Sequence, residues 1–232
     1  MLFEIQLSLG LISIALSLIL VFLFFKVYWL QRQIFLLGLP FGFLFLALSS
    51  TFLGLHLFYP YVPGLSVSLM WLRVLTQTTG FLLITLSYIL SGKIQRTTRY
   101  NLLTISLVII IGTIFVFGLL NTTNPPGLSI IYSINDLFTM VNLALLSYII
   151  VFLARRFSLA NPKISLLVSA PLAFAVFWLG QFSYLNWEYT RIDIALVGSQ
   201  IARVISLILF IRIYYLASKE ASINNIEQAK QG

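Results

Sequence analysis

The stretch MWLRVLTQTTGFLLITLSYIL, from Met70 to Leu90, decides the fold of this chain. It is long and apolar enough to cross the roughly 30 Å hydrocarbon core of a bilayer as a helix. Yet Arg73 lies inside it, and Thr76 and Gln77 follow at helical spacing. The stretch therefore predicts a membrane helix with one polar side, and a charged side chain there should face protein or water rather than acyl chains.

The composition of the whole chain indicates the same class. Of its 232 residues, 60% are hydrophobic and 9% are charged, whereas a soluble domain carries about 25% charged residues. The polar residues are too few to cover a globule of this size, so we expect one membrane domain with a lipid bilayer as its solvent. The net charge of +8 comes from short links between apolar runs, so we expect these residues to meet anionic lipid headgroups and no nucleic acid.

Seven apolar runs reach the length of a membrane span. No run shows the alternation of a barrel strand, and helices satisfy their own backbone groups in lipid, so we predict an all-α integral membrane protein. Residues 1–218 are expected to form a seven-helix transmembrane domain, and residues 219–232 a short polar cytoplasmic tail. The predicted spans are residues 6–27, 33–57, 66–92, 101–120, 130–154, 164–186 and 192–217.

The basic residues of the links predict the direction of the spans. Lysine and arginine occur in the first, third and fifth links and in the tail, whereas the second and fourth links have none. The sixth link holds one arginine that two acidic residues offset. The positive-inside rule then places the N-terminus outside and the C-terminus inside, as an odd number of spans requires, and we expect a multi-pass protein of the plasma membrane.

Some features recur about 130 residues apart. Arg73-Val-Leu-Thr76 of the third span matches Arg203-Val-Ile-Ser206 of the seventh, and Pro40 and Pro171 are expected to interrupt the second and sixth spans. Matches of this kind also arise by chance in a chain rich in Leu, Ile and Phe. If the repeat is real, it predicts two parallel triplets of helices joined by one linker helix, a 3+1+3 arrangement.

This layout resembles the microbial rhodopsins and the SWEET sugar transporters, which have seven helices and an outside N-terminus. The resemblance covers the whole chain but only in topology, which does not fix function. A rhodopsin holds retinal through a lysine of its seventh helix, and residues 192–217 contain no lysine. The Pro-Gln pair of the SWEETs is also missing, because Pro40 is followed by Phe41 and Pro171 by Leu172. The resemblance therefore implies a helix arrangement without retinal.

Side chains that can form a polar core lie within the predicted spans. An arginine at mid-membrane costs about 2.5–3.5 kcal/mol on insertion scales, so both deep arginines are expected to face the interior, with Arg203 deeper than Arg73. In one interpretation Arg73 and Asp136 form a structural ion pair and glutamines hold Arg203. In the other, a cavity open to the outer side binds a small anionic or strongly polar ligand. The candidate residues are Arg73, Gln77, Asp136, Trp178, Gln181, Gln200 and Arg203.

The same residues narrow the class of function. The chain has no cysteine and a single histidine, His56 at the end of the second span, and Asp136 is the one acid well inside a span. We therefore expect no enzyme, no metal site and no cofactor. The leading interpretation is a receptor-like or sensory protein that acts through a membrane or cytoplasmic partner. A small-solute transporter that uses the repeat and an accessory subunit of a larger membrane complex are the alternatives.

Overall fold

The computed structural model describes residues 2–58, 63–90, 128–158, 164–190 and 192–229, and nearly all of these residues are helical, with no β-strand among them. Five of the described helices are long and apolar enough to cross a bilayer, which indicates a membrane protein. A short 3-10 helix, η1 (Ile34–Leu37), precedes the second helix. The α-helices are α1 (Leu2–Gln31), α2 (Gly38–Phe58), α3 (Pro63–Leu90), α5 (Leu128–Ser158), α6 (Ile164–Thr190) and α7 (Asp193–Ala229).

These six helices cover the positions of six predicted spans, and the fourth predicted span, residues 101–120, lies outside the described residues. The count of seven therefore stays a prediction. The five are α1, α2, α3, α5 and α7, as judged from the residues whose side chains are described.

Two prolines differ from expectation. Pro171 lies inside a continuous α6 and Pro40 lies in the first turn of α2, so the prediction that both interrupt their spans is wrong. A first-turn proline loses no intrahelical hydrogen bond, and neighbouring helices can satisfy the backbone groups that an internal proline frees in a membrane helix. Residues 219–229 of the predicted polar tail continue α7, because they contain good helix formers and no Pro or Gly.

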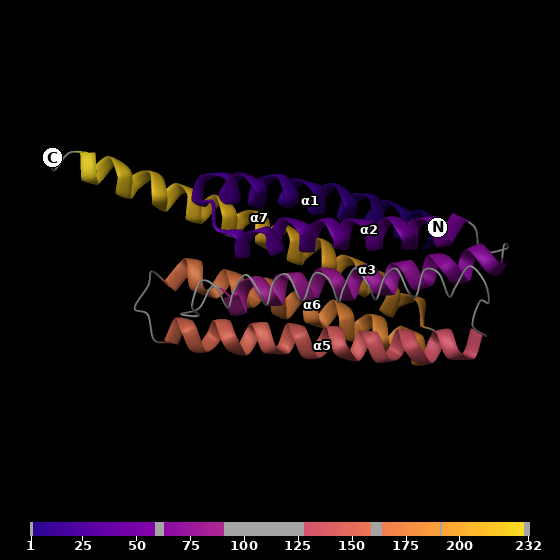
Figure 1. Cartoon of the computed structure of the whole chain (residues 1–232). Helices are drawn as coiled ribbons and strands as arrows, with labels where there is room; N and C mark the ends of the chain where they lie inside the picture. The colour runs from indigo at the N-terminus through magenta and orange to yellow at the C-terminus, as the bar shows by residue number, and fades with distance from the viewer. Residues whose placement is uncertain (1, 59–62, 91–127, 159–163, 191, 230–232) are drawn as a thin grey trace.

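The helices form a bundle in which each described α-helix packs against two others. The order of packing is α1, α2, α3, α5, α6 and α7, and α7 packs against α1 again. Figure 1 shows that α1, α3, α5 and α7 run in one direction, whereas α2 and α6 run in the other. The triplet α1–α3 thus has the same alternation of directions as the triplet α5–α7.

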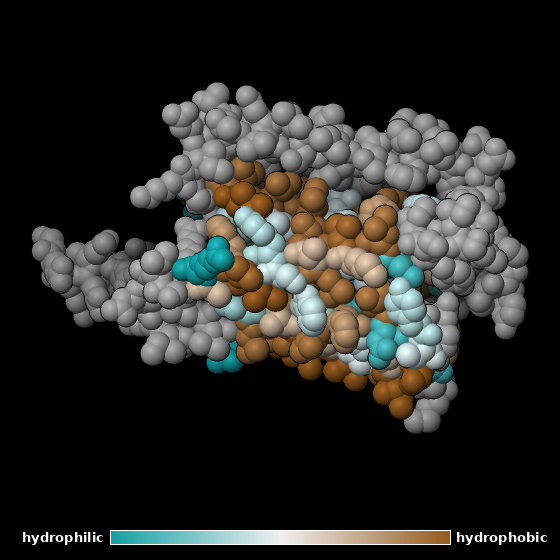
Figure 2. Space-filling model, turned by 90° about the horizontal axis from the view of Figure 1, so that it is seen from below, coloured by the Kyte–Doolittle hydropathy of each residue, from teal (hydrophilic) through white to brown (hydrophobic). Residues whose placement is uncertain are grey.

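Burial separates a central helix from peripheral ones. In an apolar 18-residue window of α3, 78% of the residues are buried, whereas 17% are buried in such a window of α1. Large apolar side chains of the outer helices are exposed, for example Phe22 of α1 and Leu137 of α5, as expected for surfaces that contact acyl chains. Figure 2 shows one face of the bundle, where apolar residues cover most of the described surface and hydrophilic residues lie toward its two ends.

Two features fix the packing of the inner helices. The backbones of α2 and α3 meet at two glycines, because a Cβ on Gly42 would lie 2.9 Å from the carbonyl oxygen of Gly80, and one on Gly80 would lie 2.8 Å from that of Gly42. Five phenylalanines, here called the aromatic layer, fill the core between α2, α3, α6 and α7 with exposed fractions of 3% or less. They are Phe43, Phe81, Phe174, Phe177 and Phe210.

The aromatic layer lies deeper in the bundle than the third-helix arginine. Phe81 stands on the half of α3 that ends at Leu90, whereas Arg73 stands on the half that begins at Pro63. Ring centroids are 5.3 Å apart between Phe43 and Phe210, and 5.1 Å apart between Phe81 and Phe177. The core is therefore aromatic toward the end of α3 and polar toward its beginning.

Candidate functional site

Arg73 of α3 is buried, with 5% of its surface exposed, as the sequence predicts. Its Nη1 donates a hydrogen bond of 2.6 Å to the hydroxyl oxygen of Tyr184 on α6. Its Cζ lies 4.1 Å from the centroid of the same ring, a distance at which the ring face attracts a cation. One tyrosine thus supplies both a hydrogen-bond acceptor and an aromatic surface to this guanidinium group.

Arg203 of α7 is also buried, with 7% of its surface exposed. Its Nη1 donates a hydrogen bond of 2.9 Å to Oγ of Ser50 on α2. The Ser50 hydroxyl in turn donates to the carbonyl oxygen of Leu46, at 3.1 Å. The Cζ of Arg203 lies 5.9 Å from the ring centroid of Phe177, so this arginine rests beside the aromatic layer, and the charges of the two arginines act on each other.

The two guanidinium groups stand at different depths along one face of α6. Phe177, Gln181 and Tyr184 follow at steps of four and three, so they share a side of the helix. Arg203 lies over Phe177 and Arg73 over Tyr184, and α6 ends at the side where α3 begins (Figure 1). Arg203 is therefore the deeper of the two, as predicted, and Gln181, itself 4% exposed, stands between their levels.

Asp136 does not compensate these charges. It is half-buried on α5, and within the described residues no ion pair joins it to Arg73 or Arg203. The guanidinium groups bind neutral hydroxyls instead, so the interpretation of an Arg73–Asp136 ion pair does not match the described contacts. Neither does a glutamine hold Arg203 through a hydrogen bond in this part of the chain.

The remaining candidate residues divide into two groups. Gln77 and Gln200 are buried, each with 4% of its surface exposed, on the helices that carry the arginines. Trp178 of α6 is half-buried and stacks on Phe182 with a centroid distance of 5.5 Å. Phe182 is 51% exposed, whereas Trp178 also packs against the core, and no described hydrogen bond joins either ring to the arginines.

Several buried polar atoms of the described helices have no hydrogen-bond partner. In the described helices, Nε of Arg73 and Oε1 of Gln200 have none, and neither has Nδ2 of Asn135 nor Oδ1 of Asn142 on α5. A buried polar group that loses its water without gaining a partner costs about 1–3 kcal/mol. An unpartnered arginine nitrogen beside uncompensated positive charge is the chemistry of an anion site.

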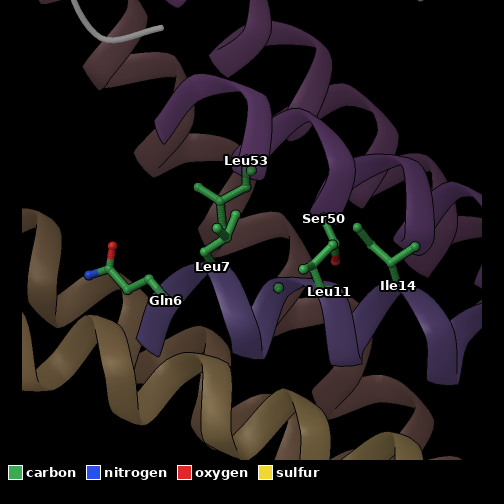
Figure 3. Close-up of a pocket in the computed structure, with 8 residues that line it drawn as sticks. Gln6, Leu7, Leu11, Ile14, Ser50 and Leu53 are labelled. Atoms are coloured by element: carbon green, nitrogen blue, oxygen red, sulfur yellow. The ribbon is translucent and has the colours of Figure 1, made fainter. Parts of the chain in front are cut away.

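A small pocket between α1 and α2 borders the partner of Arg203 (Figure 3). Its volume of about 20 Å³ is enough for one water molecule. Ser50 lines it, and it lies beside two glycines, Gly10 and Gly54, where an added Cβ would meet no atom within 4 Å. Its other walls are mainly apolar: Leu7, Leu11, Ile14 and Leu53, with Gln6 as the second polar residue.

Sequence reasoning did not pair either arginine with a hydroxyl. It places Tyr184 on the polar side of the sixth span with Gln181, but not as the partner of Arg73, and it reads Ser50 only as part of Ser49-Ser50-Thr51 in an apolar helix. The run of three hydroxyls in a membrane segment was the available signal, since such side chains often bond across helices. Which one would meet Arg203 depends on how α2 and α7 pack, and the sequence does not contain that information locally.

Comparison of the chain with protein-family models, with curated proteins and with solved structures gives no match. Among the described residues, no group of three or more His, Cys, Asp and Glu side chains could hold a metal ion. The site is therefore characterised by its own geometry: two buried arginines on hydroxyl partners, with unpartnered amide and guanidinium atoms nearby.

Proposed function

We propose that this protein is a receptor-like or sensory membrane protein that binds a small anionic ligand at Arg73 and Arg203. The observation that carries the proposal is the absence of a carboxylate partner for either guanidinium group among the described residues. Two desolvated positive charges are costly in a membrane core. An anion that receives hydrogen bonds from both would lower that cost and would thereby bind.

The position of the site supports binding from the end where α3 begins. The aromatic layer fills the core on the other side of Arg203, so a ligand that reached the arginines from that side would have to displace closely packed rings. The positive-inside rule, applied to the basic links of the sequence, predicts that α3 begins outside the cell. The proposed ligand therefore enters from outside the cell. The cytoplasmic ends of α1, α3, α5 and α7 lie on the opposite side of the plasma membrane.

The proposed output runs through a partner protein. Figure 1 shows α7 extending past the ends of the other helices, and this helix carries Arg203. A ligand that changes the contact between Arg203 and Ser50 would shift α7 relative to α2, and the extended part of α7 would present that shift to a partner. This provides a connection between the site and a cytoplasmic surface within one continuous helix.

The test is thermal unfolding of the full chain in nanodiscs of zwitterionic lipid. Sodium acetate, succinate, phosphate and sulfate are each compared with sodium chloride at matched ionic strength. We expect at least one anion to raise the melting temperature of the wild type and of Arg155→Gln, an exposed arginine of α5, but not of Arg203→Gln. If no anion separates Arg203→Gln from the control, anion binding at this site is refuted.

A small-solute transporter is the second candidate, and one observation favours it. The two triplets have equivalent neighbours: α3 packs on α2 and α5, and α7 packs on α6 and α1. The hydrogen bonds of their arginines also connect equivalent helices, α3 with α6 and α7 with α2. Such symmetry is what alternating access about a central site requires. Uptake of a radiolabelled stabilising anion into proteoliposomes, lost in Arg203→Gln, would establish transport, whereas binding without flux would favour the sensor.

A further inference from the structure

The arrangement of the arginines along α6 restricts the kind of anion that fits. The rings that they contact, Phe177 and Tyr184, are seven residues apart on one helix face. At 1.5 Å per residue this separates the two levels by about 10 Å. Gln181 lies between the levels on the same face, so the site has a positive group at each end and an amide in the middle.

Each guanidinium group keeps donors available for a ligand. Arginine has five N–H donors in a planar fork. Arg73 uses Nη1 for Tyr184, while its buried Nε has no partner in the described residues. The edge formed by Nε and Nη2 is one of the edges that bind a carboxylate through two parallel hydrogen bonds. Arg203 likewise has one side-chain hydrogen bond within the described residues, from Nη1 to Ser50.

The charge of the site favours a doubly negative ligand. Arg73 and Arg203 are two like charges buried in the same core, and guanidinium groups stay protonated in proteins. A monoanion would compensate one of them and leave the other buried without a counter-charge. A single-centre dianion would concentrate both charges at one level, whereas the arginines stand at two levels along α6.

We infer that the ligand is an α,ω-dicarboxylate, bound with one carboxylate on Arg73 and the other on Arg203, and with Gln181 beside its middle. This inference rests on the proposed function and names the ligand class of that site. The carboxylate at Arg73 takes the Nε edge, and Tyr184 keeps its bond to Nη1. The carboxylate at Arg203 lies next to the aromatic layer, where water is excluded and a charged hydrogen bond is strongest.

The experiment compares sodium succinate with sodium propionate and sodium sulfate by isothermal titration calorimetry on the full chain in zwitterionic nanodiscs. A hydrogen bond to a charged group contributes a factor of roughly ten to one hundred in affinity. We therefore expect succinate to bind roughly tenfold or more tightly than propionate, and more tightly than sulfate. The preference for succinate over propionate should disappear in Arg73→Gln and in Arg203→Gln, and persist in Arg155→Gln.

Lysine variants keep the test decisive where a glutamine variant does not fold. Arg73→Lys and Arg203→Lys retain the charge but not the fork, so each should weaken succinate binding while it leaves propionate binding to the other arginine unchanged. If sulfate binds as tightly as succinate, the inference that the site selects a ligand with two separated charges is wrong. Equal binding of succinate and propionate, sensitive to one arginine alone, would overturn the dicarboxylate and leave the anion site standing. No binding of any of the three would refute both proposals.

Discussion

Replacing single glycines of α2 by alanine should change the stability of this protein in opposite directions at Gly42 and Gly54. Both residues lie in the same helix and receive the same methyl group. The Cβ of an alanine at position 42 would stand 2.5 Å from Cγ1 of Ile84 and 2.9 Å from the carbonyl oxygen of Gly80. At position 54 it would meet nothing within 4 Å.

The size of each change in the free energy of unfolding follows from the space around the added Cβ. Ordinary contact begins at 3.4 Å, so at position 42 the carbonyl of Gly80 must recede by 0.5 Å and Cγ1 of Ile84 by 0.9 Å, the differences from 2.9 and 2.5 Å. Overpacking of this kind costs about 1–3 kcal/mol, against a helix-propensity gain of about 1 kcal/mol for alanine over glycine. Gly42→Ala should therefore lower the free energy of unfolding by about 1 kcal/mol, and Gly54→Ala, which meets no neighbour, should raise it by about 0.5–1 kcal/mol.

The measurement is reversible unfolding in mixed micelles by titration with sodium dodecyl sulfate, followed by circular dichroism. Wild type, Gly42→Ala and Gly54→Ala are compared under identical conditions, so that a shared detergent effect cancels. Gly80→Ala, on the opposite side of the same contact, should behave like Gly42→Ala because its Cβ would lie 2.8 Å from the carbonyl oxygen of Gly42. If Gly42→Ala proves as stable as Gly54→Ala, the close approach of α2 and α3 is refuted.

Three further substitutions test the site and the core by the same titration. Tyr184→Phe keeps the ring under Arg73 but removes the hydroxyl acceptor. It should lower the free energy of unfolding by about 1.5–3 kcal/mol, the value of a hydrogen bond to a charged group. An unchanged midpoint would contradict this bond. Ser206→Ala removes a 2.7 Å hydrogen bond to the carbonyl oxygen of Ala173 and should lower the free energy of unfolding by about 0.6 kcal/mol. A loss larger than that of Tyr184→Phe would contradict the expectation that the bond to the charged arginine contributes more. Phe81→Ala opens a cavity in the aromatic layer and should cost about 3 kcal/mol; added benzene should restore part of the loss, and a loss without rescue would mean that the core collapses.

Much of the helical arrangement follows from the sequence because it depends on local composition. Apolar runs of membrane length determine where α1, α2, α3, α5 and α7 lie, and the described helices extend a few residues beyond most predicted ends. The inward position of Arg73 and Arg203 was also predictable. The free-energy cost of exposing an arginine to lipid is large whatever the neighbouring helices are. In these cases the physical reason lies within a single helix.

The partners of the arginines depend on tertiary packing and could not be predicted. Charge alone favoured Asp136 as the partner of Arg73, but the hydroxyl of Tyr184 on a different helix occupies that place. Ser50 was indistinguishable from its neighbouring hydroxyls until α2 and α7 were placed together. Pro171 was expected to interrupt a helix, and its tolerance depends on what packs around α6 rather than on proline itself.

The contacts of the core divide the bundle into two helix pairs. Glycine contact joins α2 to α3, and hydrogen bonds from Ser206 to Ala173 and from Ser183 to Ala195 join α7 to α6. Both arginine bonds cross from one pair to the other, as do ring contacts of the aromatic layer. A ligand that draws Arg203 away from Ser50, while Arg73 keeps Tyr184, would therefore weaken one contact between the pairs and leave each pair intact. The aromatic layer would then act as the hinge about which the pairs separate.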